Sequence, residues 1–587
     1  MRRSATARTR TRKPAVEGLE VRALLSGTST PDLAALGTID RPRGATTIPL
    51  TIAPGTFTGD ASGKVLFNVQ VAAGDGSAAV PARFTILNAQ GRIVGLGSLR
   101  NGVVAGLAAL GTGDYQVVVR DGGAGTGAIV VTADMVGDAN GDHTVDASDL
   151  AAIQNDLGAT RSGRLGSRNS ATYDPSLDAN DDGRITNFDL ATARSNLGAS
   201  VPKVKLLVQL APDAQRTLGN ANLYIAYIVT AADGTQEYLN QYGVLTPVKG
   251  TDDDIPINGT NYASYSMPLS DSMVTNGIDV DANIPMGSTR IWISANKPVY
   301  FRVLTDSSGK VTGFVQPSVT NPSDVNYNTV FDFQEFSLSG DALNGNLTQV
   351  DMFGLPMTLQ YFSGADATTK VGIDQSRDTV LNGLGTFLAA STLPADLTQG
   401  ITAQGNLRAL SVKDFLSPYP DKQAALTYFD SAINQLWAKY PAGGPNSLTL
   451  STINATYNGQ VTSDGMFTFT PTSGTLPAVK LAKPTSWAVF SSSGSLAPGN
   501  NELGALAAQV SAALNRGVSN LDSSQWEVPA NFYPAAGPAN FYAQYWHTVS
   551  LGGLAYGFDY DDVGNQSTLI SMPNATQMTL TVHWNQS

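Results

Sequence analysis

The chain lacks cysteine and holds very little histidine or glutamate. Its 587 residues include 0 Cys and 3 His, at positions 143, 547 and 583, and only six of its 48 acidic residues are Glu. The absence of cysteine excludes disulfides, zinc–thiolate sites and cysteine nucleophiles. So few histidines leave little material for histidine-based catalysis, and carboxylates are the reactive groups in good supply.

Charge and long apolar runs are also scarce. Charged residues make up 14% of the chain, and 36 basic against 48 acidic residues give a net charge of −12. A protein that coats nucleic acid needs a basic surface, so that class is excluded. No run of about 18 apolar residues occurs, so the sequence predicts no transmembrane helix. A hydrophobic content of 42% excludes a mostly disordered chain, and the length suits roughly two to four domains.

Residues 1–42 form an N-terminal segment that is basic at its start. Residues 1–13 carry six of the 36 basic residues, but the apolar core of a secretory signal peptide does not follow them. Instead, Gly18–Ser26 reads GLEVRALLS and resembles a short segment found near the start of many exported planctomycete proteins. We therefore expect a disordered export segment and an extracellular or cell-surface protein. The alternative is a chance match in a disordered tail.

Residues 43–133 alternate short apolar runs with glycine-rich turns. Val65–Val69, Ala82–Leu87 and Tyr115–Val119 are typical of short strands. The spacing predicts a small antiparallel β-sandwich. No catalytic pattern occurs in it, so we expect an accessory domain, either a spacer or a weak glycan-binding module.

Two acidic loops of the same pattern follow within residues 134–200, the second starting 40 residues after the first. Side-chain oxygens or a backbone carbonyl at positions 1, 3, 5, 7, 9 and 12 are the arrangement of a calcium-binding loop. The expected ligands are Asp138, Asn140, Asp142, Thr144, Asp146 and Asp149 in the first loop and Asp178, Asn180, Asp182, Arg184, Thr186 and Asp189 in the second. Each loop runs into a helix that ends at a glycine.

This repeat resembles the type I dockerin, whose calcium loops end in Asp. The resemblance implies two structural Ca²⁺ ions and suggests a cohesin-like protein as partner, although the sequence leaves open whether such a partner exists. His143 stands at position 6 of the first loop, where glycine normally makes the sharp turn. We therefore expect weaker calcium binding at the first loop.

From residue 203 onward the pattern changes to longer strands that are followed by helices. Val204–Leu210 alternates as in a half-buried strand, and Leu223–Val229 is a fuller one. Helical spacing occurs in Leu426–Tyr440 and in Leu503–Leu514, the latter behind asparagine caps at 500 and 501. A β part joined to an α/β part is expected, with the groove between them as the natural binding site.

Two carboxylates in this region have the spacing of a catalytic pair. Glu335 lies in an aromatic strand, Val330–Leu338, where partial desolvation would raise its pKa as a general acid requires. After a turn-like stretch comes a second strand with Asp351, which an antiparallel pairing centred on Leu343 would bring close to Glu335. Inverting glycosidases place two carboxyls about 6.5–9.5 Å apart. The expected spacing is compatible with such a catalytic pair but does not establish it. The alternative is that both carboxylates are ordinary surface charges.

Longer motifs surround both carboxylates. Gly313–Thr329, Phe333–Phe336 and Thr348–Pro356, with further matches from Leu407–Ser411 to Tyr556–Val563, resemble glycoside hydrolase family 64. These β-1,3-glucanases have a thaumatin-like β-barrel or sandwich domain joined to an α/β domain with a wide groove between them. The resemblance covers nearly all of residues 203–587 and implies that Glu335 is the general acid and Asp351 the general base of an inverting reaction.

The same resemblance implies a set of substrate-binding positions. These are Thr348, which matches a family residue, Ser337, Ser339 and Asn344, which stand where Thr, Asn and Trp occur in relatives, and His547, in a strand-like segment. Loss of an aromatic side chain at 344 affects sugar stacking and product length. His547 is expected to be structural or to contact sugar. Asp561 and Asp562 could contact sugar or a cation, or lie in a solvated turn.

Together these features predict a multidomain, mainly β, secreted protein. The predicted activity is that of an inverting endo-β-1,3-glucanase that cleaves laminarin- or curdlan-type glucan to short oligosaccharides such as laminaripentaose, with no cofactor for catalysis. The leading alternative is a non-catalytic β-glucan-binding surface or assembly protein. A third is a hydrolase whose preferred linkage has changed.

Overall fold

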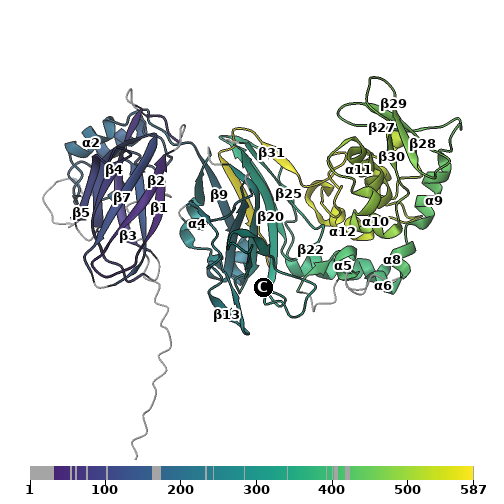
Figure 1. The fold of residues 1–587 in the computed structure, drawn as a ribbon, viewed down its shortest axis with the longest axis horizontal. Coiled ribbons are helices and arrows are strands. Elements are labelled where there is room, and N and C mark those ends of the chain that lie inside the picture. The colour runs from purple at the N-terminus through teal and green to yellow at the C-terminus, as the bar shows by residue number, and fades with distance from the viewer. Residues whose placement is uncertain are drawn as a thin grey trace, which may run out of the picture. The chain divides into compact units, whose positions relative to one another are not determined.

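The structure is a computed structural model that describes residues 32–585 apart from short gaps. The gaps are 53–55, 60–62, 75–76, 101–102, 124, 161–172, 181, 232–233, 242, 283–284, 340–341, 392, 399–400, 402–406 and 417–422. The chain divides into two units, Met1–Pro202 and Lys203–Ser587 (Figure 1). Gly18–Ser26, on which the export prediction depends, lies outside the described residues. Within the described part of the chain, no helix has the length and apolar character needed to cross a membrane.

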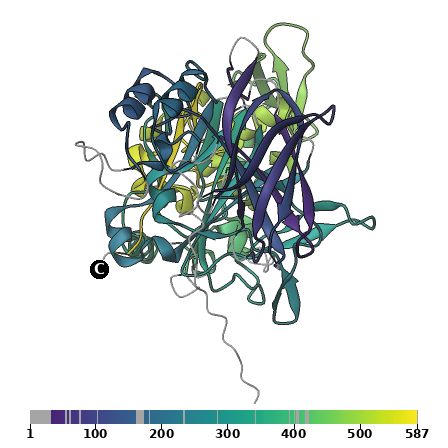
Figure 2. The same cartoon turned by 90° about the vertical axis from the view of Figure 1, so that its left-hand side faces the viewer.

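The first unit is built on one antiparallel sheet of eight strands in the order β1-β8-β3-β6-β5-β4-β7-β2. The strands are β1 (Leu33–Ile39), β2 (Ala45–Ile52), β3 (Lys64–Ala73), β4 (Pro81–Asn88), β5 (Ile93–Arg100), β6 (Val103–Gly111), β7 (Gly113–Asp121) and β8 (Gly127–Met135). The sheet curls until its end strands meet, since a Cβ at Gly37 of β1 would lie 2.5 Å from the Ile48 side chain of β2. It is therefore one barrel-like sheet rather than two separate layers (Figure 2). The sheet also begins at Leu33, ahead of the boundary predicted at 43.

The segment with the acidic loops packs onto this sheet. It contains α1 (Ala147–Asn155), a 3₁₀ turn (Pro175–Leu177) and α2 (Asn187–Arg194). Its own small core includes Ile153 and Leu190, while Val145, Ala199 and Val201 join the core of the sheet. The segment is thus an integral part of the first unit.

The β part of the second unit consists of two packed sheets. The larger has the order β12-β11-β10-β17-β20-β21-β31, with β15 beside β10, and the smaller has the order β16-β9-β32-β23-β24, with β25 beside β23. Their strands are β9 (Lys203–Leu210), β10 (Leu223–Thr230), β11 (Gln236–Leu239), β12 (Leu245–Pro247), β15 (Met267–Pro268), β16 (Ile278–Asp281), β17 (Met286–Ala295), β20 (Val330–Ser339), β21 (Ala342–Leu347), β23 (Met357–Ser363), β24 (Asp366–Ala367), β25 (Val371–Gly372), β31 (Ile570–Met572) and β32 (Gln577–Val582). Alternate apolar residues of the two sheets, such as Leu206, Ile291 and Leu343, form the core between them.

Short elements complete this part. They are α3 (Pro212–Thr217), α4 (Asp271–Asn276), the hairpins β13 (Ile255–Ile257) with β14 (Thr260–Tyr262) and β18 (Arg302–Thr305) with β19 (Val311–Val315), and β22 (Met352–Phe353), which leads out of the β part. Strand β22 pairs with β26 (Ala409–Leu410) of the helical part, so this two-stranded pairing joins the two parts.

The helical part surrounds a second large core. It comprises α5 (Arg377–Ala390), α6 (Ala395–Thr398), α7 (Val412–Leu416), α8 (Gln423–Thr427), α9 (Asp430–Lys439), α10 (Ser486–Ser491), α11 (Glu502–Asn515) and α12 (Phe541–Val549), with a four-stranded sheet of β27 (Leu448–Ser451), β28 (Thr456–Val461), β29 (Phe467–Pro471) and β30 (Val479–Leu481). The core includes Phe429, Leu436, Tyr457 and Trp546. The predicted multidomain, mainly β fold class is confirmed.

Two local predictions differ from the structure. The helical pattern in Leu426–Tyr440 is split between α8 and α9, and Phe429 caps α9 without a side-chain hydrogen bond. His547 lies in helix α12, so its predicted strand-like segment is wrong; Asn540 caps the helix by accepting from the Ala543 N–H. The prediction of a cap at 501 is confirmed, since Asn501 accepts from the Gly504 N–H.

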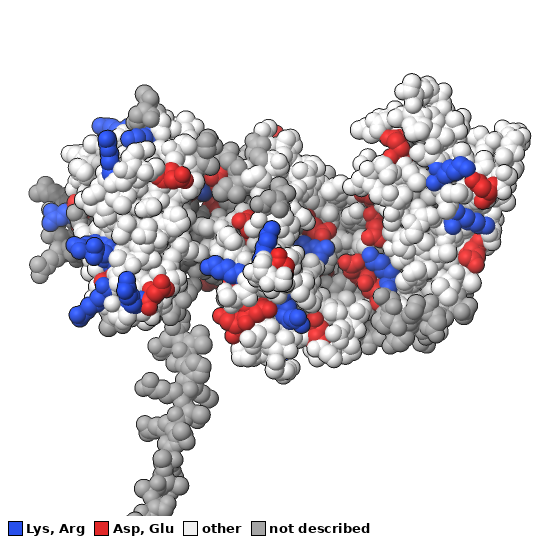
Figure 3. Space-filling model, in the orientation of Figure 1, with Lys and Arg blue, Asp and Glu red and all other residues white. Residues whose placement is uncertain are grey.

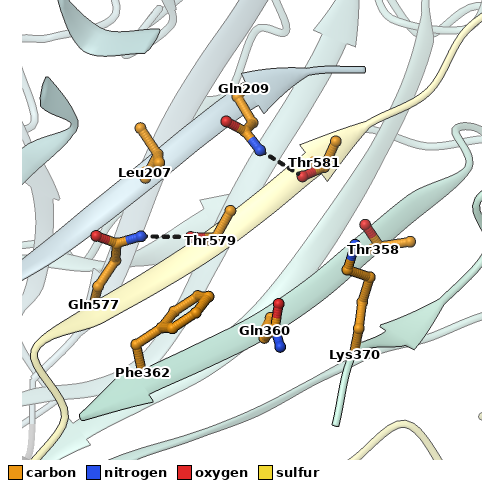
Figure 4. A pocket seen from close by; sticks show the side chains of 9 residues that line it. All are labelled: Leu207, Gln209, Thr358, Gln360, Phe362, Lys370, Gln577, Thr579 and Thr581. Atoms are coloured by element: carbon orange, nitrogen blue, oxygen red, sulfur yellow. Dashed lines mark hydrogen bonds between the residues drawn. The ribbon is translucent and has the colours of Figure 1, made fainter. Parts of the chain in front are cut away.

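The outer face of the smaller sheet carries a shallow hollow of about 290 Å³. Its side chains come from β9, β32 and β23 and are chiefly amides and hydroxyls, with Phe362 and Lys370 at one side (Figure 4). Gln209 donates to Thr581 and Gln577 donates to Thr579, so these groups bond along and across the strands. None of the predicted site residues lines this hollow.

Candidate active site and calcium loops

Glu335 lies on strand β20, on the face of the sheet that turns away from the core between the sheets. Phe336 and Leu338 point into that core, whereas Phe333 belongs to an aromatic cluster on the opposite face. Because side chains alternate along a strand, Glu335 shares the face of Phe333 and of Ser337. Its side chain is 35% exposed.

A neighbouring strand supplies a cation to this carboxylate. Arg290 of β17 is directly opposite Glu335 in the register, and its Nε donates to Glu335 Oε1 at 2.8 Å. The guanidinium also lies over the Phe333 ring, 4.5 Å from its centre, and donates to the Gln316 side chain. These contacts fix the arginine, and through it the Glu335 carboxylate.

The predicted strand pairing of Glu335 with Asp351 is wrong. In the hairpin, Ser339 pairs with Ala342, so the turn is much shorter than the predicted stretch, and Glu335 pairs with Asn346. Asp351 follows the end of β21 and lies in the loop that leads to β22. Turn length sets the register of a hairpin, and the apolar pattern here allowed more than one length.

The predicted substrate positions Ser337, Ser339 and Asn344 do share the face of Glu335. Ser337 pairs with Asn344, and Asn344 is exposed. On its other side Asn344 pairs with Ser571 of β31, so the row of polar side chains extends across three strands. Thr348 is different: it is buried, and its hydroxyl accepts from the Val350 N–H within the loop.

The loop that carries Asp351 is fixed at several points. The Gln349 N–H donates to the Tyr556 carbonyl at 2.8 Å, and the Tyr542 hydroxyl donates to the Gln349 carbonyl at 2.8 Å. The Ser411 N–H donates to the Asp351 carbonyl at 2.9 Å. The Asp351 side chain itself is 45% exposed and lies 2.9 Å from the Lys413 ammonium.

Tyr556 lies beside the loop that carries Asp351, since its carbonyl accepts from the Gln349 N–H. Burial raises the pKa of Tyr556, and the charges of Asp562, Asp559, Asp561 and Glu335 raise it further. Figure 3 shows that the second unit is hollowed between the part that carries β31 and the part that carries α11, with acidic and basic groups gathered toward the floor of the hollow. A groove between the two parts was expected at this place.

Asp332, three residues before Glu335, supports the joint between the two parts. It is buried, and its carboxylate accepts from the N–H groups of Gly354 and Leu355 at 2.7 and 3.0 Å. Burial raises the pKa of Asp332 to about 7, against the lowering effect of these bonds and of Arg377. The side chain thereby fixes the chain just after β22.

His547 belongs to a buried network. Its Nε2 lies 2.9 Å from Asp561 Oδ2, and Asp561 also accepts from the Arg516 guanidinium at 3.1 Å. Burial lowers the pKa of His547, but the charge and hydrogen bond of Asp561 and the bond to the Gly553 carbonyl together raise it by more, so the pKa lies above its usual value. Arg516 and Asp561 are completely buried. Asp561 is therefore a structural residue here, and His547 fixes the segment that follows α12.

In the first unit, both acidic loops have the turn that calcium loops require. His143 and Gly183, at position 6, adopt φ values of 64° and 87°. Asp138 Oδ2 accepts from the His143 N–H and Asp178 Oδ2 from the Gly183 N–H. Asp149, at position 12 of the first loop, is also the third residue of α1 and accepts from the Asp146 N–H, closing a capping box.

His143 finds a partner outside its loop. Its Nδ1 lies 2.7 Å from Asp32 Oδ1, and both residues are buried. One ligand atom from each of Asp32, Asp138 and His143 lies within 4.8 Å of the others. The left-handed backbone of a non-glycine residue costs roughly 1–2 kcal/mol, and the pairing with Asp32 offsets this cost.

The donor set of the loops fits Ca²⁺. Within the described residues, Asp189 Oδ1 is buried and has no hydrogen-bond partner. Burial raises the pKa of Asp138 to about 7, with Asp32 adding to the effect, and burial also raises the pKa of Asp149 and Asp189. Buried carboxylate oxygens at the spacing of a calcium loop are the ligands that a hard divalent cation prefers.

Three side chains of the candidate active site were missed by sequence reasoning. Arg290 is identified only by the register of β17 against β20. Lys413 follows the matched Leu407–Ser411 motif by two residues, and Asp559 lies between Phe558 and Asp561 of another matched motif. The proximity of Lys413 and Asp559 to these motifs was the available signal, but no pattern in the sequence pairs either residue with Asp351.

Two family models match parts of this chain. Residues 207–582 match the family model for glycoside hydrolase family 64, described as "Beta-1,3-glucanase", and residues 136–197 match the model for the dockerin type I domain. The match over residues 207–582 places this mainly β protein in the class of glycoside hydrolases. The chain belongs to glycoside hydrolase family 64.

Two relatives are named glucan endo-1,3-beta-glucosidase, from Arthrobacter sp. (strain YCWD3) and from Cellulosimicrobium cellulans. Each is 28% identical over 303 residues, which are 50% of this chain and 51% of the relative. The chain thus spans about half the length of the curated relatives it matches.

Solved structures are similar over about two thirds of this chain. A β-1,3-glucanase domain of family 64 from Clostridium beijerinckii is 26% identical, with a TM-score of 0.55, over 65% of this chain and 98% of that one. A laminaripentaose-producing β-1,3-glucanase in complex with laminaritetraose gives the same identity and coverage with a TM-score of 0.51.

Proposed function

We propose that this protein is an extracellular or cell-surface endo-β-1,3-glucanase that cleaves its substrate with inversion. The observation that carries the proposal is the pair of carboxylates Glu335 and Asp351, each beside a cation, within the region that matches the family model. The names of the relatives and the laminaritetraose complex of a similar structure support β-1,3-glucan as the substrate.

In this proposal Glu335 is the general acid. Its proton goes to the glycosidic oxygen, the bond from this oxygen to the anomeric carbon breaks, and the leaving sugar departs as an alcohol. Arg290 holds Oε1 of the carboxyl, and the strand fixes the direction in which the side chain points. Position on a rigid central strand supports this role, because a proton donor has to be placed within hydrogen-bond reach.

Asp351 is the general base in the same proposal. It takes a proton from a water molecule, whose oxygen attacks the anomeric carbon from the face opposite the leaving group. A partly exposed carboxylate on a fixed loop at the joint between the two parts suits this role, because water has to reach it.

The glucan would lie along the polar face of β20, β21 and β31. Ser337, Ser339, Asn344 and the neighbouring Ser571 offer hydroxyl and amide groups to sugar hydroxyls. We propose that the products are short oligosaccharides such as laminaripentaose, with Asn344 influencing their length. Thr348 contributes by holding the loop that carries Asp351, through its bond with the Val350 N–H. His547 contributes by holding Asp561.

Glucan hydrolysis by the full-length chain tests the proposal. Glu335→Gln should lower kcat on laminarin by roughly 10²–10⁴-fold, the contribution of general acid catalysis, while binding to insoluble curdlan is retained. Glu237→Gln on β11 of the same sheet is the matched control and should keep full activity. Proton NMR of the first product should show the α-anomer.

Other outcomes decide against parts of the proposal. Undiminished hydrolysis by Glu335→Gln would remove this residue from the acid role, and a β-anomer would exclude inversion. A wild-type chain that binds curdlan but releases no sugar would instead be a β-glucan-binding surface module.

For the first unit we propose a dockerin module that holds two structural Ca²⁺ ions and binds a cohesin-like protein. The match of residues 136–197 and the fit of both loops support the ions. Phe188 in the first turn of α2 and Leu197 beyond its end are more than half exposed, so each offers an apolar side chain to a partner. Retention of the chain on an immobilised type I cohesin with calcium, and its release by chelator, is the expected result.

A further inference from the structure

Lys413 makes contacts that the proposed roles of Glu335 and Asp351 do not explain. It is the second residue of α7, which begins directly after the pairing of β22 with β26. Its ammonium lies 2.9 Å from Asp351 Oδ1 and 3.5 Å from Asp559 Oδ1. One cation thus bridges two carboxylates from segments that are more than 200 residues apart in the sequence.

The ammonium is well placed to act as a fixed charge. The Lys413 side chain is 19% exposed, whereas the carboxylates that it contacts are more open. Burial lowers the pKa of Lys413, but the charge and hydrogen bond of Asp351 and the charges of Asp559 and Asp414 together raise it by more, so the group stays cationic at neutral pH.

The loop and the segment joined by this bridge are also connected through their backbones. Gln349 donates to the Tyr556 carbonyl, three residues before Asp559, and Ser411 donates to the Asp351 carbonyl, two residues before Lys413. The backbone bonds place the Asp351 chain, but they leave its side-chain rotamer undetermined. Among the contacts of the described residues, the bridge to Lys413 is the one that orients the Asp351 carboxylate.

We propose that Lys413 is a positioning residue for glucan hydrolysis, and that Asp559 is its second anchor. The ammonium holds the Asp351 carboxylate in the orientation in which it accepts a proton from the attacking water. This inference rests on the proposed function, in which Asp351 is the general base.

Several titratable groups surround the bridge. Asp414, beside Lys413 in α7, accepts from the Ser411 hydroxyl, and burial raises its pKa to about 6, with Asp351 and Asp559 contributing. Burial raises the pKa of Tyr542 and of Tyr556 well above the usual range, so both phenols are neutral at working pH. The cluster therefore holds three carboxyl groups around one ammonium.

The test is the pH dependence of kcat/KM on laminarin for the full-length chain. Removal of the ammonium in Lys413→Met leaves carboxylates close together, and one of them then takes up a proton more readily. The acidic limb should move to higher pH by about one unit, the usual size of such a charge effect, so the loss of activity is largest at low pH. Lys413→Arg should return the limb toward the wild-type position.

Asp559→Asn gives a shift of opposite sign. The asparagine still accepts a hydrogen bond from Lys413 but removes one negative charge near Asp351, so the acidic limb should move to lower pH. Because Asp559 is partly exposed, this variant should fold even where Lys413→Met does not. Lys480→Met, which removes the exposed ion pair with Asp464, is the matched control and should leave the profile unchanged.

The outcomes separate the inference from the function beneath it. Two results would overturn the positioning role of Lys413 if the wild-type chain is active. One is an acidic limb in Lys413→Met at the same pH as in the wild type, and the other is an equal loss of kcat/KM at every pH. Absence of hydrolysis by the wild-type chain would instead overturn the proposed function.

Discussion

Single side chains in this protein are held by partners that lie far away in the sequence. Arg290 holds Glu335 from the adjacent strand, and Lys413 holds Asp351 from the start of a helix. His143 of the first acidic loop is likewise held by Asp32, ahead of strand β1. In each case the partner restricts a side chain that would otherwise be mobile. This restriction costs side-chain entropy, but it gives the charged group a defined position.

The pair of His143 and Asp32 leads to a prediction about stability. Glycine at 143 would relieve a left-handed backbone by roughly 1–2 kcal/mol. The buried Asp32 carboxylate would lose its histidine partner, however, and breaking a buried pair costs about 3–5 kcal/mol. His143→Gly should therefore lower the stability of the first unit, even though glycine is usual at this loop position.

Thermal unfolding of the calcium-loaded chain measures this effect. Asp32→Asn combined with His143→Gly should recover part of the lost stability, since the asparagine is uncharged. A His143→Gly variant as stable as the wild type would show that the pair contributes nothing.

At the scale of elements, the hairpin of β20 and β21 sets the position of Glu335. The two strands approach closely at Gly345, where a Cβ would lie 2.4 Å from the Glu335 carbonyl and 2.4 Å from the Tyr361 hydroxyl. Neither a backbone carbonyl nor a buried tyrosine can move away easily, so this position requires glycine for space.

Gly345→Ala should consequently destabilise the second unit by about 1–3 kcal/mol, the usual cost of overpacking, and lower glucan hydrolysis by displacing Glu335. Gly385→Ala is the matched control, because the space around a Cβ in that part of α5 is open. Alanine there should stabilise the helix by roughly 0.5–1 kcal/mol. Chemical denaturation measures the free energy of unfolding of both variants. Equal changes in this free energy would contradict the packing argument.

At the scale of the whole molecule, the proposed calcium loops and the proposed catalytic residues belong to different units. The acidic loops lie in Met1–Pro202, and Glu335, Asp351 and Lys413 lie in Lys203–Ser587. Because Val145 and Ala199 of the loop segment join the core of the eight-stranded sheet, an ion bound there stabilises that whole unit. A ligand at 100 times its Kd adds about 2.7 kcal/mol to the stability of a folded domain.

Chelation should therefore lower the unfolding temperature of one transition and leave glucan hydrolysis unchanged. Scanning calorimetry of the full-length chain with calcium and with EGTA measures the first effect, and sugar release under the same conditions measures the second. A loss of hydrolysis in EGTA that calcium restores would show that the two units depend on one another.

The sequence by itself determined a good part of this protein. Period-two apolar patterns such as Lys203–Leu210 indicated the strands, and the repeated spacing of acidic residues from Asp138 and from Asp178 indicated the loops, since both patterns are local. The motifs around Glu335 and Asp351 indicated the family for the same reason. The loop carboxylates and the motifs that carry Glu335 and Asp351 could thus be identified without coordinates.

The tertiary structure decided what depends on contacts between distant segments. The register of β20 placed Asn346, not Asp351, opposite Glu335, because the length of the turn is set by packing of the whole sheet. The helix around His547 replaced a predicted strand because its apolar side chains pack into the helical core. Above all, the cations Arg290 and Lys413 reach their carboxylates only through strand pairing and through the joint of β22 with β26, and no local pattern records either.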